Sequence, residues 1–271
     1  MSVHKTFIRA LTILLTLLLT LLGSLSSQAS PFDLQFSDQD ELDAYIVSKD
    51  QQIARYPSKA LYYLQRADAM FLNHDFHAAI QNYDEALRLQ PRLVESHFGR
   101  GLALARAGDI EQGIKELSIY ISHKPQSSLA YTKRGVRHIW IADYHNAKND
   151  LEKAITLDNT NAEAHDDLGV VFAQNKEYIK AAEQFAMATK LDPSYQKAYH
   201  NMAVVGYITG NDSAALRYVD RSLDLAPQSR SSMLLKSEIL RTLGRYSEAT
   251  DIKDDADFLP EGNWSENVAI E

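Results

Sequence analysis

The chain has 271 residues, of which 45% are hydrophobic and 24% charged, so a packed core can form and gross disorder is not expected. It contains no cysteine, which excludes disulfide frameworks, thiolate metal sites, cysteine nucleophiles and a lipid-modified N-terminal cysteine. The formal net charge is −8, but residues 57–250 hold 23 basic and 23 acidic side chains. Because this central part has no basic stripe, we do not expect nucleic-acid binding.

Residues 1–29 have the order of a secretory signal peptide. Lys5 and Arg9 precede an apolar run of about fifteen residues, and the small residues Ser27 and Ala29 follow it. A membrane-spanning helix needs roughly 20 apolar residues, so the run is short for an anchor. We expect cleavage after Ala29 and a periplasmic or secreted protein, with an uncleaved N-terminal membrane anchor as the alternative. No later stretch is long and apolar enough to span a membrane.

From residue 57 onward the sequence repeats every 34 residues. One column of this repeat is proline in five of six places, and it consists of Pro57, Pro91, Pro125, Asn159, Pro193 and Pro227. Proline lacks the N–H that would continue a helix, so each unit is predicted to end in a helix stop. We expect Asn159 to change its helix end little. A fixed period of this size indicates a stacked repeat.

Two further columns hold only small residues, twelve positions apart in each unit. They are Ala67, Gly101, Gly135, Gly169, Ala203 and Ser237, and then Ala79, Gly113, Ala147, Ala181, Ala215 and Ala249. Small side chains let two antiparallel helices cross closely. Turn signals such as "AGD" at 107–109 and "LGR" at 243–245 fall between the columns. Each unit is therefore predicted to be helix, tight turn, helix, proline.

This pattern resembles the tetratricopeptide repeat (TPR) family. The resemblance covers residues 60–259 and implies an all-α, right-handed superhelical solenoid of about six helix-turn-helix units. The predicted units are 60–93, 94–127, 128–161, 162–195, 196–229 and 230–259. In the last unit Lys253 occupies a large apolar column, as expected of a terminal cap with a polar outer face.

Acidic segments flank the array. Residues 30–59 form an acidic N-terminal segment with a capping helix expected over 38–56, and residues 260–271 form an acidic, flexible tail. We interpret both as solubilising ends. The alternative is that the tail, which contains Trp264, docks on a basic partner.

No catalytic motif was found. The chain has no glycine-rich phosphate loop, no H-E-x-x-H and no G-x-S-x-G. The "HDFH" stretch at 74–77 offers too few ligands for zinc. We therefore expect no enzyme activity, no metal and no cofactor.

The resemblance implies a peptide-binding groove lined by the first helix of each unit. The register assigns to it Phe71, Phe98, Leu102, Arg106, Val136, Trp140, Asp166, Val170, Lys197, His200, Val204 and Tyr207. The alternative for the apolar members is that they pack between units as core. The family's carboxylate clamp needs Lys and Asn at places that hold Leu64 and Asp68 in the first three units. The clamp is incomplete in every frame, so we exclude that specificity.

Two functions remain open. The first is a non-enzymatic scaffold outside the cytoplasm that binds a protein or peptide segment in the groove, in envelope assembly or regulation of envelope enzymes. The second is a structural protein that oligomerises through its terminal units.

Overall fold

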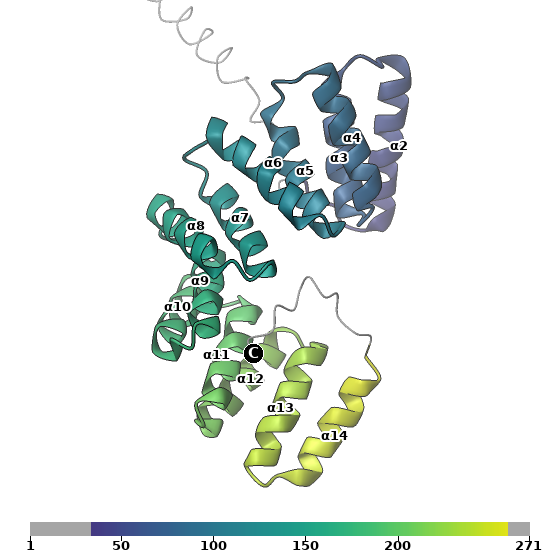
Figure 1. Ribbon diagram of the computed structural model, residues 1–271. Helices are drawn as coiled ribbons and strands as arrows, with labels where there is room; N and C mark the ends of the chain where they lie inside the picture. Colours follow the sequence, from purple (N-terminus) through teal and green to yellow (C-terminus); the bar gives the residue numbers. More distant parts are fainter. Residues whose placement is uncertain (1–33, 260–271) are drawn as a thin grey trace, which may run out of the picture. The chain divides into compact units, whose positions relative to one another are not determined.

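The computed structural model describes residues 34–259 (Figure 1). The predicted signal segment 1–29 and acidic tail 260–271 lie outside the described residues. Between residues 34 and 259 all regular structure is helical, so the predicted all-α repeat fold is confirmed. The described residues divide into two compact units, with the boundary between Gly99 and Arg100.

The first described helix of the first unit is α2 (Gln39–Arg55), which falls in the segment predicted to cap the array. It packs against α3 (Ala60–Leu72), which in turn packs against α4 (Phe76–Leu89). The next helix, α5 (Val94–Arg106), contains the boundary between the two units. Antiparallel helices joined by short turns thus build the first unit.

The second unit repeats this hairpin along the chain. Its helices after α5 are α6 (Ile110–His123), α7 (Ser128–Trp140), α8 (Tyr144–Leu157), α9 (Ala162–Gln174), α10 (Tyr178–Leu191), α11 (Gln196–Ile208), α12 (Asp212–Leu225), α13 (Arg230–Thr242) and α14 (Tyr246–Asp257). From α6 to α14 each helix packs against the next one in sequence. In addition α7 contacts α9, α9 contacts α11, and α11 contacts α13. The first helices of successive repeats therefore lie side by side and form one wall.

The proline column marks the ends of the second helices. Helix α10 ends at Leu191, two residues before Pro193, and α12 ends at Leu225, two residues before Pro227. Helix α8 ends at Leu157, in the same register, although Asn159 replaces the proline. The prediction that this replacement leaves the helix end in place is confirmed. The missing proline is tolerated because the turn that follows, rather than the ring alone, ends the helix.

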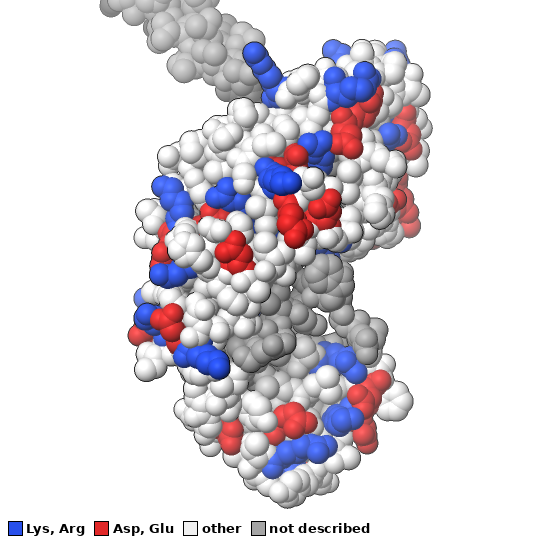
Figure 2. Space-filling model, viewed as in Figure 1, with Lys and Arg blue, Asp and Glu red and all other residues white. Residues whose placement is uncertain are grey.

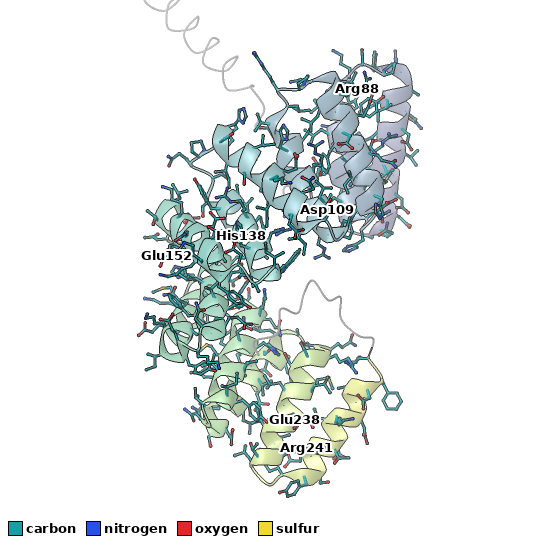
Figure 3. All side chains as sticks on the ribbon, viewed as in Figure 1. Arg88, Asp109, His138, Glu152, Glu238 and Arg241 are labelled. Atoms are coloured by element: carbon teal, nitrogen blue, oxygen red, sulfur yellow. The ribbon has the colours of Figure 1, made fainter. Side chains whose placement is uncertain are left out.

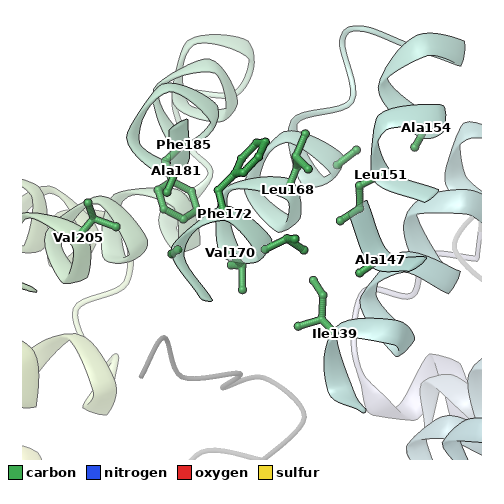
Figure 4. Packing of buried hydrophobic residues seen from close by; sticks show 13 residues of the cluster. Ile139, Ala147, Leu151, Ala154, Leu168, Val170, Phe172, Ala181, Phe185 and Val205 are labelled. Carbon is green, nitrogen blue, oxygen red and sulfur yellow. The ribbon is translucent and has the colours of Figure 1, made fainter. Parts of the chain in front are cut away.

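The two small columns lie where the helices of each hairpin cross. Their alanines are buried, and a Cβ atom added to Gly101 would lie 2.9 Å from the carbonyl oxygen of Gly113. One added to Gly169 would lie 2.5 Å from Cε1 of Phe185. Figure 4 shows the resulting core in the middle of the second unit, where Leu151, Phe185 and Val205 approach from α8, α10 and α11. The predicted close crossings are confirmed.

A ladder of arginines also joins the two helices of each of the first three repeats. Arg66 donates to Asn82 at 2.7 Å, and its guanidinium also lies 2.5 Å from Asp50. Arg100 pairs with Glu116 at 2.7 Å. Arg134 donates to both oxygens of Asp150 at 2.8 and 2.6 Å, the bidentate geometry that makes such pairs strong. These arginines are 34 residues apart, as are their three partners sixteen residues later.

The tight turn inside each hairpin places one residue in the left-handed backbone region. Gly108, Gly210 and Gly244 have φ of 101°, 76° and 76°. The equivalent turns use His74, Ala142 and Lys176, with φ between 56° and 61°. Only glycine adopts this conformation without a steric cost, so three of the six turns are strained by their sequence.

The last hairpin has the character expected of a terminal cap. In α14 most side chains are exposed, and Lys253 donates to Asp257 at 2.7 Å instead of entering a core. On the face drawn in Figure 2, acidic and basic side chains are interspersed within each unit. Among residues 34–259 no helix combines the length and apolarity that a membrane crossing needs.

Candidate binding wall

The candidate site of the second unit is the wall of first helices α7, α9 and α11, which we call the first-helix wall. Seven of the predicted groove residues lie on these helices. Six of them are half-buried or exposed, and the seventh, Asp166, is buried and lies near Lys197. The seven are Val136, Trp140, Asp166, Lys197, His200, Val204 and Tyr207. Glu238 extends the same register onto α13 (Figure 3), where Arg241 lies 3.9 Å from it.

The other predicted groove residues have different surroundings. Leu102 and Val170 are buried, so little of either side chain is available to a ligand. In the first unit Phe98 is also buried, whereas Phe71 is half-buried and packs on Phe76 with ring centroids 5.5 Å apart. Arg106 is half-buried.

Two adjacent aspartates lie at the centre of the wall. Asp166 and Asp167 on α9 are both buried, and Asn201 on α11 donates to Oδ1 of Asp166 at 2.9 Å. Oδ2 of each aspartate is buried without a hydrogen-bond partner in the described part of the chain. Burial raises the pKa of both carboxyl groups, and Lys197 opposes that rise. Unsatisfied buried oxygens of this kind destabilise the fold unless something binds them.

Lys197 is the cation that both aspartates share. Its Nζ lies 4.0 Å from Oδ2 of Asp166 and 3.6 Å from Oδ1 of Asp167, beyond the usual hydrogen-bond distance. Burial alone would lower the pKa of Lys197, but the two aspartates and Glu163 outweigh it, so the pKa is raised and the ammonium stays charged. The side chain of Lys197 is 45% exposed.

Helix α7 contributes positive charge to the same wall. Lys133 donates to Glu163 of α9 at 2.5 Å. Arg137 is buried, and its guanidinium lies 4.7 Å from the ring centroid of Trp140, a cation–π contact. Burial lowers the pKa of Arg137 to about 10, so it is still protonated at neutral pH. Its Nε is another buried atom without a hydrogen-bond partner among the described residues.

A polar network closes the α11 end of the wall. His200 Nδ1 lies 2.9 Å from Oγ of Ser232, and Ser232 lies 2.9 Å from Ser222. Gln196 donates to Ser222 at 2.6 Å. Burial, with a smaller contribution from Lys197, lowers the pKa of His200 to about 4. His200 is therefore neutral at pH 7 and positions α11 against α13.

The first unit has a buried acid of its own. Asp68 on α3 accepts a hydrogen bond of 2.7 Å from the hydroxyl of buried Tyr83. Burial raises the pKa of Asp68 to about 7, although the bond from Tyr83 lowers it in part. Gly99 makes room for this pair, because a Cβ there would lie 2.3 Å from the Tyr83 hydroxyl oxygen.

Several members of the first-helix wall were missed by the sequence reasoning. The missed residues Lys133, Asp167 and Asn201 occupy one column, 34 residues apart, and the missed Glu163 shares a column with Lys197, which was predicted. A search for charged columns on the first helices would have found them. Between residues 34 and 259, no group of three or more His, Cys, Asp or Glu side chains is arranged to hold a metal ion.

Comparison with known proteins agrees with this architecture. A TPR repeat family model matches residues 67–108, and a tetratricopeptide repeat model matches residues 141–195. These two stretches of the chain are tetratricopeptide repeats.

Among curated proteins, the chain is 25% identical over 170 residues to the protein O-mannosyl-transferase TMTC1 of Homo sapiens. That alignment covers 61% of this chain but 19% of the human protein. Among solved structures, the APC/C hetero-tetramer Cut9–Hcn1 has a TM-score of 0.74 at 15% identity, covering 83% of this chain and 45% of that one. YrrB, described as a TPR protein with an unusual peptide-binding site, has a TM-score of 0.52 at 20% identity, covering 69% of this chain and 96% of that one. These structural likenesses show the fold alone.

Proposed function

We propose that the chain is a non-enzymatic scaffold that acts outside the cytoplasm and binds a peptide or protein segment on the first-helix wall. TPR proteins act as protein-interaction scaffolds, and this proposal gives the role a surface and a compartment. A role in envelope assembly or in the regulation of envelope enzymes is part of the proposal. The signal-like order of residues 1–29 supports the compartment.

The observation that carries the surface is the set of incompletely bonded buried atoms on one wall. Oδ2 of Asp166, Oδ2 of Asp167 and Nε of Arg137 come from adjacent helices, α9 and α7. Half-buried Trp140 and Tyr207 lie on the same helices or the next, and large aromatics are enriched at binding hot spots. A bound segment can supply both the missing hydrogen bonds and an apolar contact.

Site-specific photocrosslinking in the native compartment tests this surface. A benzoylphenylalanine at Ile208, exposed on α11, reports on the wall, and one at Ile179, 80% exposed on α10, is the matched control. We expect a crosslinked partner from position 208 and none from position 179. Equal crosslinking from both positions, or crosslinking from the control alone, would exclude the wall as the binding surface.

The exposed apolar side chains of the terminal helices favour a second candidate, self-assembly through the end units. Phe258 is 88% exposed after α14, and Tyr246 is exposed at its start. In the first unit Val47 of α2 is exposed. Two different end surfaces of this kind would give head-to-tail contacts. Multi-angle light scattering over a range of concentrations distinguishes the candidates, since a chain that stays monomeric cannot be a self-assembler.

A further inference from the structure

The aspartate pair of the first-helix wall lacks hydrogen-bond donors. Asp166 and Asp167 together present four carboxylate oxygens, and Asn201 satisfies Oδ1 of Asp166. Oδ2 of each residue has no partner among the described residues. Buried carboxylates normally accept several hydrogen bonds, so these two are left short of donors.

Lys197 neutralises this pair without satisfying it. At 4.0 and 3.6 Å its ammonium is close enough for Coulombic attraction but too far for a normal hydrogen bond. Because its side chain is 45% exposed, the end of the lysine can swing into solvent without disturbing a packed core. Lys197 therefore has the properties of a displaceable occupant.

An independent feature lies on the neighbouring helix. Arg137 is buried on α7, and its Nε lacks an acceptor in the described chain. It lies within electrostatic range of Asp167 and Glu163, so it belongs to the same charged wall. An extended segment carries a backbone carbonyl that can accept from such an N–H. The carboxylates on α9 thus need hydrogen-bond donors, and Nε of Arg137 on α7 needs an acceptor. A peptide offers both.

We propose that the segment bound on the first-helix wall presents an arginine or lysine side chain, which displaces Lys197 and donates hydrogen bonds to Oδ2 of Asp166 and Asp167. This inference rests on the proposed function and names the ligand chemistry. A guanidinium fits best because its planar fork offers five donors, whereas the ammonium of Lys197 reaches neither carboxylate closely.

The charge of the site favours a cation over an anion. An acidic group that approached Lys197 would also approach two buried carboxylates, and like charges brought together at an interface are strongly unfavourable. An arriving cation instead replaces the charge of Lys197. The released lysine can then bind a carbonyl or acidic group elsewhere on the same segment.

Three tripeptide probes test the proposal on the full chain. They are acetyl-Ala-Arg-Ala-amide, the same peptide with neutral citrulline in place of arginine, and the same peptide with glutamate. Binding is measured by amide chemical shifts in two-dimensional NMR. We expect the arginine probe to shift amides of α9 and α11, and the citrulline probe to bind at least about tenfold more weakly. Equal affinity for arginine and citrulline, or preference for glutamate, would overturn the proposal.

The direction in which one substitution changes the affinity for the arginine probe distinguishes a displaceable lysine from a ligand-binding lysine. Lys197→Met should tighten binding of the arginine probe several-fold, because it removes the internal competitor. Asp167→Asn should weaken it at least tenfold. Lys190→Met, which removes an exposed lysine on α10, is the matched control and should leave the affinity for the arginine probe unchanged. Weaker binding by Lys197→Met would contradict displacement.

Folding and the underlying function are checked separately. Circular dichroism establishes whether Lys197→Met is folded, and Lys197→Gln replaces it in the same test if it is not. If the partner crosslinks at position 208 but its binding segment binds equally with arginine or citrulline, the ligand class is wrong and the scaffold function stands. If nothing crosslinks at the wall and the arginine probe shifts no amide of α9 or α11, both are wrong.

Discussion

Replacing Gly169 tests the close crossing that sets the helix spacing in the middle of the second unit. Even a Cβ atom at Gly169 would lie 2.5, 2.6 and 3.0 Å from three ring atoms of Phe185. Phe185 is fully buried, so its ring has no empty space to enter. Leucine adds three further carbons beyond that Cβ. The substitution Gly169→Leu should therefore force α9 and α10 apart.

The magnitude follows from two opposing effects. Overpacking a core typically costs about 1–3 kcal/mol, and this site should lie at the upper end because the first added atom already overlaps the ring. Replacing a glycine inside a helix by a residue with a side chain stabilises the helix by about 0.5–1 kcal/mol. We expect a net loss of about 2 kcal/mol. For a unit of this size that lowers the unfolding midpoint by roughly 4–8 °C.

Thermal unfolding followed by circular dichroism measures the loss, and hydrogen exchange locates it. Protection should fall first in α9 and α10 and then in neighbouring helices, since repeats contact mainly their neighbours. Ala186→Leu adds the same side chain to the exposed face of α10 and should be nearly neutral. Adding Phe185→Ala to Gly169→Leu should restore part of the stability, because it removes the ring that clashes. An unchanged midpoint in Gly169→Leu would refute the crossing geometry.

Four further predictions concern other parts of the chain. Burial raises the pKa of Asp68 from 3.8 to about 7, so the folded state binds the extra proton and stability should fall as pH rises from 4 through 7. Asp68→Asn should remove this pH dependence and raise the free energy of unfolding by up to about 4 kcal/mol at pH 8. Urea titrations can measure the change, with Asp40→Asn at an exposed position as the control. Ala142→Gly should raise the unfolding free energy by about 1 kcal/mol, because φ is 56° there, and an unchanged or lower value in urea would contradict the strain. Trp140→Ala should weaken partner binding by about 2 kcal/mol or more while lowering the unfolding midpoint less than Gly169→Leu does. Normal affinity in a stable variant would show that Trp140 is not part of the binding surface. Mass spectrometry of the native protein should find Ser30 as its first residue, and an intact N-terminus in a membrane pellet would favour the anchor.

The repeated features could be predicted because they obey one period. A helix crossing needs a small residue in every repeat, so Gly135 and Gly169 are visible as members of a column. Gly99 belongs to no such column. It is required by the Tyr83–Asp68 pair of a single repeat, and no periodic search identifies a residue of that kind.

The wall could be predicted in position but only partly in composition. The register placed Asp166 and Lys197 on first helices, and the structure brings them within 4.0 Å. The same register also assigned Leu102 and Val170 to the groove, although both are buried. A helix register fixes the direction of a side chain, whereas burial depends on how closely the next helix packs. Sequence reasoning of this kind therefore cannot separate wall from core among apolar residues.

The charged residues are therefore the better guide to function. A stacked repeat needs its small and apolar columns, and every repeat supplies them. It does not need an aspartate at 167 or an arginine at 137, where burial disfavours the charged form of each side chain. Local departures from the rules of stable packing are expected at functional sites. Because these two unfavourable groups lie on adjacent helices of one wall, that wall is the first surface to test for a partner.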